Sequence, residues 1–341
     1  MTDMNRQVLL TLRPSGIAQA ENFTIREAAV PAAGPGELLV RNHYLSVEPA
    51  MRGWIADTGN YTKPIELGSV MRSLASGVVI ESRHPDYREG DCVSGWFGWQ
   101  DYACITPDQI VQRTTASEMR ASLGILGTNG VTAYLALTLI GQPRAGETVL
   151  VSTAAGAVGS AAGQIARILG CRTIGIAGGP DKVSRCIREF GYDAAIDYRA
   201  QDVSAALAGH APDGIDIYFD NVAGPISDAV LPHLALRARV IVCGTASIDR
   251  WTPWPTGPRV ERHLLVKRAR MEGFVIFDHM DRYQDAVGQL RTWISEGRLL
   301  WREDILDGIE ACPDALAGLY RGENDGKRLI RLVGDDAGGN Q

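Results

Sequence analysis

In the second half of the chain, short apolar runs alternate with segments whose apolar residues recur at helical spacing. Strands are expected where the runs are continuous and rich in β-branched residues, and amphipathic helices are expected between them. The expected strands are 148–151, 172–177, 193–197, 215–221, 238–244 and 271–277. One expected helix follows the turn at 152–156 and ends at 169. The other expected helices span 181–190, 203–208, 226–235 and 280–297. This alternation predicts a parallel, doubly wound sheet.

The N-terminal part of the chain has short strands separated by Gly and Pro. They are expected at 7–12, 37–47, 78–80, 91–96 and 98–105. This pattern predicts a mainly β domain, built as a distorted barrel. Two helical runs follow, one capped by Ser117 and carrying Met119, Leu123 and Leu126, the other at 132–140. The strand expected at 328–333 is not needed by the wound sheet, so it should return to the β domain, and the polar residues 335–341 should fray.

Composition narrows the class of protein. With 341 residues, the chain is long enough for two domains. A net charge of -6 argues against a nucleic-acid partner, which requires a basic surface. No apolar run is long enough to span a bilayer, and the N-terminus lacks the apolar core of a signal peptide. The cysteines are scattered without a C-x-x-C pair, which favours reduced thiols in the cytoplasm. No Cys/His spacing typical of zinc is present, so no metal is expected.

The glycine-rich turn at 156–163 is the strongest candidate for a binding site. Gly156, Gly159 and Gly163 follow a strand and open a helix. That order presents free backbone N–H groups and a positive helix end to a phosphate. Close packing of a helix on a strand also selects glycine, so the triplet alone is not decisive. Its context predicts a dinucleotide site.

The end of the second strand of this unit bears on the choice of cofactor. An NAD site needs an acidic residue there, which accepts from the ribose 2′-OH. The chain has Ala177-Gly178-Gly179 instead, with no carboxylate before Asp181 and with Lys182 at the start of the next helix. Small residues leave room for a phosphate and Lys182 supplies charge, so NADPH is expected. The alternative for Lys182 is a solvated helix lysine.

Several motifs in fixed order resemble one enzyme family. They are AAGAVGSAAGQIA at 154–166, DNVAG at 220–224, GDCVSGWFGWQDY at 90–102 and VEPAMRG at 47–53. They resemble the zinc-independent medium-chain dehydrogenases/reductases, in the group of leukotriene B4 dehydrogenase/prostaglandin reductase, plant double-bond reductases and bacterial curcumin reductases. The resemblance runs from about Val8 to Val333. It implies a GroES-like β-barrel domain, 1–123 completed by 300–341, and a Rossmann domain at 124–299, with the active site in the cleft between them.

The resemblance also implies which residues bind the cofactor. Gly156, Ala157, Val158 and Gly159 would hold the pyrophosphate, and Lys182 and Tyr198 the adenosine 2′-phosphate. The nicotinamide side would be lined by Asn221, Cys243, Gly244, Thr245, Phe274, Val275, Ile276 and Asn324. From the residues alone, a turn asparagine is the favoured interpretation of Asn324, and Phe274–Ile276 is equally a buried core strand.

One candidate catalytic residue, Tyr61, matches a tyrosine that reaches the substrate carbonyl in some relatives. Its phenol could donate to the oxygen on which enolate charge develops, and the alternative is a surface tyrosine. The chain departs from the family where Asp249 stands at the position of a usual tyrosine and where Thr128-Asn129 replaces Met-Pro. Both changes weaken the assignment of the substrate and the proton donor.

The implied reaction is NADPH-dependent reduction of the C=C bond of an α,β-unsaturated ketone or aldehyde, without metal. Relatives are commonly homodimers joined at the edge of the Rossmann sheet, where the 271–277 strand could serve. Three alternatives remain open at this point: an NADPH quinone oxidoreductase, a non-catalytic NADPH-binding or sensing protein, and a zinc alcohol dehydrogenase. The last conflicts with Ser46-Val47-Glu48 and Leu74-Ala75-Ser76, which stand where that family has its Cys and His-Glu zinc ligands.

Overall fold

The structure, a computed structural model, describes residues 4–57, 60–251 and 253–334. Contacts along the chain divide it into two compact units, Met1–Gly124 with Glu303–Gln341, here called the β unit, and Ile125–Arg302, called the Rossmann unit. Within the described residues, no helix has the length and apolar character needed to cross a membrane. Residues 335–341, which the sequence predicts to fray, lie outside the described residues.

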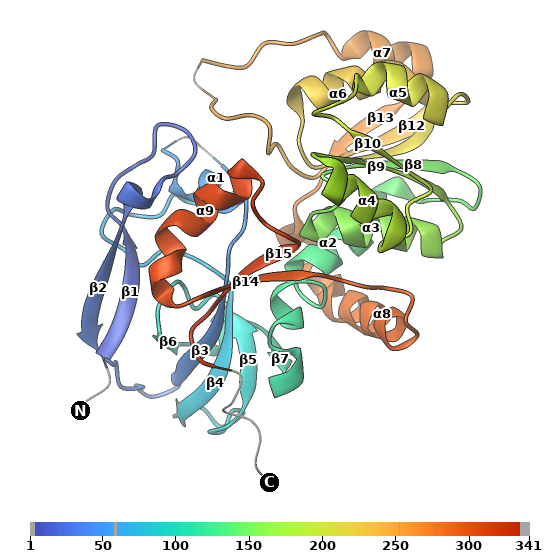
Figure 1. The fold of residues 1–341 in the computed structure, drawn as a ribbon. Helices are drawn as coiled ribbons and strands as arrows, with labels where there is room; N and C mark the ends of the chain where they lie inside the picture. Colours follow the sequence, from blue (N-terminus) through green and yellow to red (C-terminus); the bar gives the residue numbers. More distant parts are fainter. Residues whose placement is uncertain (1–3, 58–59, 252, 335–341) are drawn as a thin grey trace. The chain divides into compact units, whose positions relative to one another are not determined.

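The β unit contains two sheets (Figure 1). β1 (Met4–Leu10) pairs antiparallel with β2 (Phe23–Ala29). The larger sheet has the order β14-β15-β3-β4-β5-β7, with β6 also paired to β3. Its strands are β3 (Leu38–Ser46), β4 (Ala75–Ser82), β5 (Cys92–Gly95), β6 (Tyr102–Ile105), β7 (Ile110–Thr114), β14 (Glu303–Asp307) and β15 (Lys327–Arg331). Two helices accompany them, α1 (Met51–Ile55) and α9 (Cys312–Arg321).

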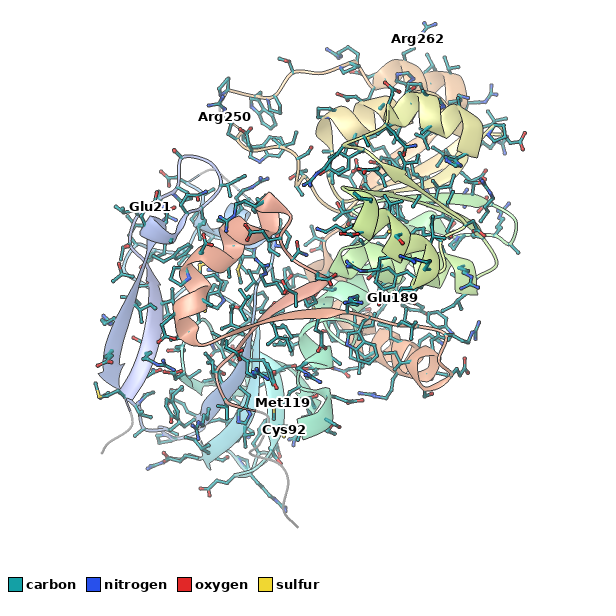
Figure 2. The ribbon with its side chains drawn as sticks, viewed as in Figure 1. Glu21, Cys92, Met119, Glu189, Arg250 and Arg262 are labelled. Atoms are coloured by element: carbon teal, nitrogen blue, oxygen red, sulfur yellow. The ribbon has the colours of Figure 1, made fainter. Side chains whose placement is uncertain are left out.

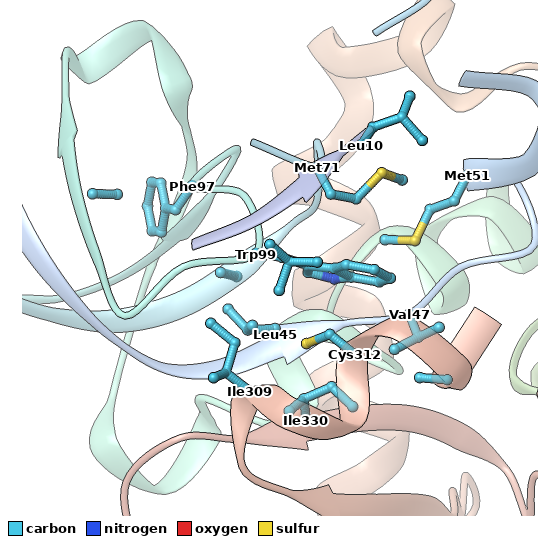
Figure 3. Close-up of a cluster of buried hydrophobic side chains, with 14 of the residues drawn as sticks. Leu10, Leu45, Val47, Met51, Met71, Phe97, Trp99, Ile309, Cys312 and Ile330 are labelled. Carbon is cyan, nitrogen blue, oxygen red and sulfur yellow. The ribbon is translucent and has the colours of Figure 1, made fainter. Parts of the chain in front are cut away.

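The core of the β unit joins distant parts of the chain. β15 pairs antiparallel with β3, so the C-terminal strand returns to the N-terminal sheet as the sequence predicts. Figure 3 shows Trp99 between Met71, Leu45 and Val47, with Ile330 and Cys312 from the C-terminal segment close by. The Trp99 indole N–H donates to the Ser46 carbonyl oxygen at 3.0 Å, which satisfies its one polar atom in this apolar site. The C-terminal segment therefore completes this core.

The Rossmann unit is a parallel six-stranded sheet with the order β10-β9-β8-β11-β12-β13. Its strands are β8 (Thr148–Ser152), β9 (Arg172–Ala177), β10 (Ala194–Asp197), β11 (Ile215–Asp220), β12 (Leu234–Val242) and β13 (Arg270–Gly273). Its helices are α2 (Thr128–Leu135), α3 (Ala157–Ile168), α4 (Pro180–Arg188), α5 (Val203–His210), α6 (Gly224–Val230), α7 (Glu261–Lys267) and α8 (Tyr283–Ser295). The strand order reverses between β8 and β11, which is where such sheets bind ligands.

The apolar runs form these strands because most of their side chains are buried. Leu150, Ile174, Tyr218 and Val240 come from four neighbouring strands and share one core cluster. A strand covered by helices on both faces has no solvent side, so its sequence is continuously apolar rather than alternating. This confirms the doubly wound sheet.

Three expectations about local structure are wrong. The helix expected after Ser117 is replaced by short 3₁₀ turns, Ala116–Glu118 and Ala121–Leu123. Its apolar residues are buried all the same: Met119, labelled in Figure 2, packs with Tyr44 and Leu74. The helix expected at 226–235 ends at Val230, since β12 begins at Leu234 and pairs with β11. The strand expected at 271–277 ends at Gly273.

Candidate functional site

The turn after β8 has the geometry expected of an anion site. Thr153 adopts a φ of 53°, and its carbonyl oxygen accepts from the Gly156 N–H at 2.9 Å. Gly156 is the N-cap residue of α3, and it has no side chain to accept from the first-turn N–H groups. Those N–H groups belong to Ala157, Val158 and Gly159, of which the first two are half-buried. The helix end is therefore polar, positive and uncapped by the protein.

Two glycines of the motif are required by close contacts. A Cβ on Gly159 would lie 2.2 Å from the Thr153 carbonyl oxygen, so the turn closes only with glycine there. A Cβ on Gly163 would lie 2.0 Å from Cζ of Tyr192. The Tyr192 hydroxyl donates to the Gly159 carbonyl oxygen at 2.7 Å. Gly163 thus serves the packing of α3, whereas Gly156 and Gly159 shape the turn.

The ends of β9 and β10 carry the next candidates. Gly179, with a φ of 93°, is the N-cap of α4, and the half-buried Lys182 lies in the first turn of that helix. Tyr198 follows β10 and is 41% exposed. A Cβ on Gly178 would lie 2.8 Å from Cε1 of Tyr198, so the tyrosine ring packs directly on the glycine. The structure thus brings Tyr198 to the loop that precedes Lys182.

Asn221 lies at the point where the strand order reverses. Its backbone N–H donates to Ser152 Oγ at 2.8 Å and its Nδ2 donates to the Ser152 carbonyl oxygen at 2.7 Å. These bonds tie the end of β11 to the end of β8. Because they use the donors of Asn221, its side chain has a defined orientation at this edge.

Asp220 is a buried carboxylate that sequence reasoning missed. Its Oδ1 accepts from the Tyr218 hydroxyl at 3.0 Å and from the N–H groups of Val222 and Ala223, both at 2.9 Å. Its Oδ2 accepts from Ser227 Oγ at 2.6 Å. Ala223 has a φ of 58°, which is strained for a residue with a side chain. The carboxylate holds that loop in place. In the sequence, the Asp220-Asn221 pair at the end of the expected strand was the feature that could have indicated it.

The ends of β12 and β13 complete this edge of the sheet. The N–H groups of Cys243 and Gly244 donate to the Asp220 carbonyl oxygen at 2.8 and 3.1 Å. A Cβ on Gly244 would lie 2.7 Å from the Asn221 carbonyl oxygen, so the two loops are in close contact. Burial raises the pKa of the Cys243 thiol to about 12, so the thiol is protonated at neutral pH. Thr245 follows and is half-buried.

Phe274–Ile276 is not a strand, contrary to one of the two interpretations of its sequence. The segment leaves β13 after the Phe274 N–H donates to the Val242 carbonyl oxygen at 3.0 Å. Phe274 and Ile276 are buried and Val275 is half-buried. A 3₁₀ segment, Ile276–Arg282, follows at once.

Tyr61 and Asn324 belong to the β unit. Tyr61 is 51% exposed, and its hydroxyl oxygen accepts from the Trp54 indole N–H at 3.3 Å. Trp54 is buried in α1 and packs edge-on against Trp96. Asn324 Nδ2 donates to the Gly326 carbonyl oxygen at 2.9 Å, as a turn asparagine does. In the described part of the chain, no three His, Cys, Asp or Glu residues are grouped so that they could hold a metal ion.

The chain is similar to proteins of known activity along nearly its whole length. It is 41% identical over 338 residues to the NADPH-dependent curcumin reductase of Escherichia coli, covering 97% of this chain and 98% of that one. It is 38% identical over 336 residues to the 2-alkenal reductase (NADP(+)-dependent) of Nicotiana tabacum, covering 96% and 97%. The chain belongs to the medium-chain dehydrogenase/reductase superfamily, in the group of these reductases. The family expected from the motifs is confirmed.

Family profiles and a solved structure agree with membership in this superfamily. Residues 6–112 match the N-terminal domain of oxidoreductase, and residues 157–292 match a family described as zinc-binding dehydrogenase. The crystal structure of CurA in complex with NADPH from Vibrio vulnificus is 39% identical, with a TM-score of 0.92, and the match covers 96% of this chain and 99% of that one. The medium-chain dehydrogenase/reductase fold, a GroES-like β unit and a Rossmann sheet, is therefore confirmed.

Proposed function

We propose that this protein is an NADP-dependent oxidoreductase that reduces the C=C double bond of α,β-unsaturated ketones or aldehydes with NADPH. Full-length similarity to an NADPH-dependent curcumin reductase and a 2-alkenal reductase carries the proposal. Hydride goes to the β-carbon and a proton to the α-carbon, so the bond gains two hydrogens. No metal takes part, because conjugation with the carbonyl already makes the β-carbon electrophilic.

The residues at the edge of the Rossmann sheet fit NADPH. The uncapped N-terminus of α3 offers the N–H groups of Ala157, Val158 and Gly159 to the pyrophosphate. The absence of a Cβ at Gly159 lets the backbone close into the turn that presents them. Lys182 and Tyr198 would bind the adenosine 2′-phosphate. The nicotinamide would be lined by Asn221, Cys243, Gly244, Thr245, Phe274, Val275, Ile276 and Asn324. When bound, NADPH supplies the hydride.

The preference for NADPH over NADH follows from the carboxylates near the end of β9. Asp197 ends the neighbouring strand, but its Oδ1 already accepts from the N–H groups of Gly179 and Arg199 at 2.8 and 3.0 Å. Oδ1 thus binds the backbone of the two loops, and β9 itself ends at Ala177 without the acidic residue that an NAD site has there. Lys182, in the first turn of α4, adds the positive charge that a phosphate requires.

Tyr61 is the residue we propose to act on the substrate. An indole N–H only donates, so at its contact with Trp54 the Tyr61 oxygen is the acceptor. We propose that the Tyr61 hydroxyl donates to the substrate carbonyl oxygen, where negative charge develops as hydride reaches the β-carbon.

The two units would divide the work, with the β unit as the catalytic domain and the Rossmann unit as the NADP-binding domain. We further propose a homodimer. β13 is the outer strand of the sheet and all four of its residues are exposed, so it offers an unpaired edge to a second copy. Sedimentation equilibrium should give the mass of two 36.8 kDa chains. All six cysteines are free thiols, which supports a reducing, cytoplasmic location.

The test of the function is NADPH oxidation, followed by absorbance, with 2-cyclohexenone and then with a small quinone. We expect enone-dependent oxidation that yields cyclohexanone, and slower turnover with NADH. Oxidation with the quinone alone would identify a quinone oxidoreductase instead. Tight NADPH binding without oxidation across a panel of enones, enals and quinones would identify a non-catalytic NADPH-binding protein. Stoichiometric zinc in the purified protein would contradict the metal-free reaction.

A further inference from the structure

The loops after β9 and β10 are held together by one carboxylate oxygen. The two strands run parallel with Asp197 opposite Ala177, so the residues that follow each strand reach the same edge. Asp197 Oδ1 accepts from the Gly179 N–H on one loop and from the Arg199 N–H on the other. This fixes the backbone of Arg199 beside the N-terminus of α4, the helix that carries Lys182.

The Arg199 side chain lies over Gly178 together with the Tyr198 ring. A Cβ on Gly178 would lie 3.0 Å from Arg199 Nε and 2.8 Å from Tyr198 Cε1. The Arg199 guanidinium carbon is 5.9 Å from the Tyr198 ring centroid. The guanidinium therefore lies beside Gly178, just after the end of β9, and the arginine remains exposed to solvent.

The Arg199 guanidinium forms no direct ion pair within the described residues. Among residues 4–57, 60–251 and 253–334, no carboxylate forms a salt bridge with it. Hydrogen bonds from the N–H groups of Gly179 and Arg199 lower the pKa of Asp197, and the charge of Arg199 acts in the same direction, so this carboxyl stays ionised. The carboxylate oxygen that makes these bonds is bound to backbone, and the guanidinium keeps its own donors for a ligand.

We propose that Arg199 is a specificity-determining residue that binds the adenosine 2′-phosphate of NADPH together with Lys182 and Tyr198. The inference rests on the proposed function, because it assumes NADPH as the cofactor. A guanidinium presents several N–H groups in a planar fork and pairs with two phosphate oxygens at once, whereas a lysine acts as a point charge. Gly178 leaves the space for it, since any side chain there would meet both Tyr198 and Arg199.

The test measures cofactor binding without substrate. Calorimetric titration of wild type and Arg199→Ala with NADP⁺ and NAD⁺ should show NADP⁺ binding weakened about tenfold, the scale of one charge-assisted contact of roughly 1.4 kcal/mol at a solvated site. NAD⁺ binding should stay unchanged, because NAD⁺ has no 2′-phosphate. The pair 2′,5′-ADP and 5′-AMP should reproduce the difference without the nicotinamide half. Arg199→Lys should recover part of the loss.

Arg188→Ala is the matched control. Arg188 is an exposed arginine in the last turn of α4, so its removal lowers the net charge of the same unit equally. It should leave both affinities within about twofold of wild type. If Arg199→Ala retains the wild-type preference for NADP⁺, or weakens NAD⁺ equally, the role of Arg199 is wrong and the proposed function stands. If the wild-type protein binds NADP⁺ and NAD⁺ equally well, both the NADPH assignment and this inference are wrong.

Discussion

The ammonium nitrogen of Lys327 lies 3.0 Å from Oε1 of Glu48, and both side chains are buried. Lys327 begins β15, and Glu48 follows β3, to which β15 is paired. The ammonium also donates to Ser46 Oγ at 2.6 Å and to the Val47 carbonyl oxygen at 3.1 Å. Burial lowers the pKa of Lys327, and the Glu48 carboxylate acts in the opposite direction. All three acceptors lie on the segment that leads from β3 into α1.

Replacing Lys327 with methionine should destabilise the β unit strongly. The change leaves the Glu48 carboxylate buried without its counter-charge, which typically costs about 3–5 kcal/mol. The double variant Lys327→Met/Glu48→Gln removes both charges and should recover a large part of that loss. Urea denaturation followed by tryptophan fluorescence measures the free energy of unfolding of both variants. A single variant within about 0.5 kcal/mol of wild type would show that the pair is not coupled.

Gly163→Ala should destabilise the Rossmann unit even though alanine favours helices. Its Cβ would lie 2.0 Å from Cζ of the buried Tyr192 and 2.2 Å from its hydroxyl oxygen. The ring must move, and its hydrogen bond to Gly159 is strained, so we expect a loss of about 1–3 kcal/mol.

Gly288→Ala is the control for helix propensity. Gly288 lies within α8, and a Cβ there meets nothing within 4 Å. This variant should gain about 0.4–1 kcal/mol through the smaller entropy of its unfolded chain. Thermal denaturation of the two variants should therefore shift in opposite directions. Equal shifts would mean that Tyr192 yields to the added methyl group without cost.

The stability of the Rossmann unit should depend on Cys186 in alkaline solution. Burial in α4 raises the pKa of this thiol from 9.0 to about 12. Above pH 9.0 the unfolded chain therefore releases the thiol proton while the native state holds it, so the free energy of unfolding falls as pH rises towards 12. At about pH 10 the loss from this group is about 1.4 kcal/mol.

Cys186→Ala isolates this contribution. The variant should be less stable than wild type at about pH 8, because it leaves a small cavity, and should lose less stability up to about pH 10. Denaturant midpoints at the two pH values give the two slopes. Parallel slopes would show that Cys186 does not titrate differently in the two states.

The sequence predicted the strands of the Rossmann sheet because strands that are buried on both faces have continuously apolar sequences. The strand expected at 172–177 has the bounds of β9, Arg172–Ala177. β2 gave no comparable signal, since most of Phe23–Ala29 is not buried and, in the part of the chain that the structure describes, it pairs only with β1. At 231–235 the spacing of apolar residues also suits a helix. The chain forms β12 from Leu234 instead, because Leu234 pairs with Ile215 of β11.

The candidate site was predictable in its residue types and not in its hydrogen bonds. Gly156, Gly159 and Lys182 stand out because glycines and a positive charge at a helix start are typical of a phosphate site. Asp197 does not stand out, because its carboxylate acts through the backbone N–H groups of two loops. The Trp54–Tyr61 bond was equally hidden, since nothing in the pattern indicates which loop tyrosine an indole meets. Such contacts depend on tertiary structure.

Tyr61→Phe should lower kcat for enone reduction by at least about tenfold if the phenol stabilises charge in the transition state. The binding of NADPH should be unaffected, which titration without substrate can verify. Tyr87→Phe is the control, because Tyr87 is a half-buried tyrosine of the β unit that packs against His84 and Arg113. An unchanged kcat in Tyr61→Phe would remove Tyr61 from the mechanism.

Trp54→Phe tests whether the indole orients that phenol. Phenylalanine keeps an aromatic ring beside Trp96 but removes the N–H that donates to Tyr61. We expect kcat to fall about threefold to tenfold with KM little changed, since one neutral hydrogen bond contributes about 1 kcal/mol. In the Tyr61→Phe background the same change should cost nothing further, because the hydroxyl that accepts the bond is already absent. If Trp54→Phe slows both backgrounds by the same factor, the two residues act independently and the indole has a packing role only.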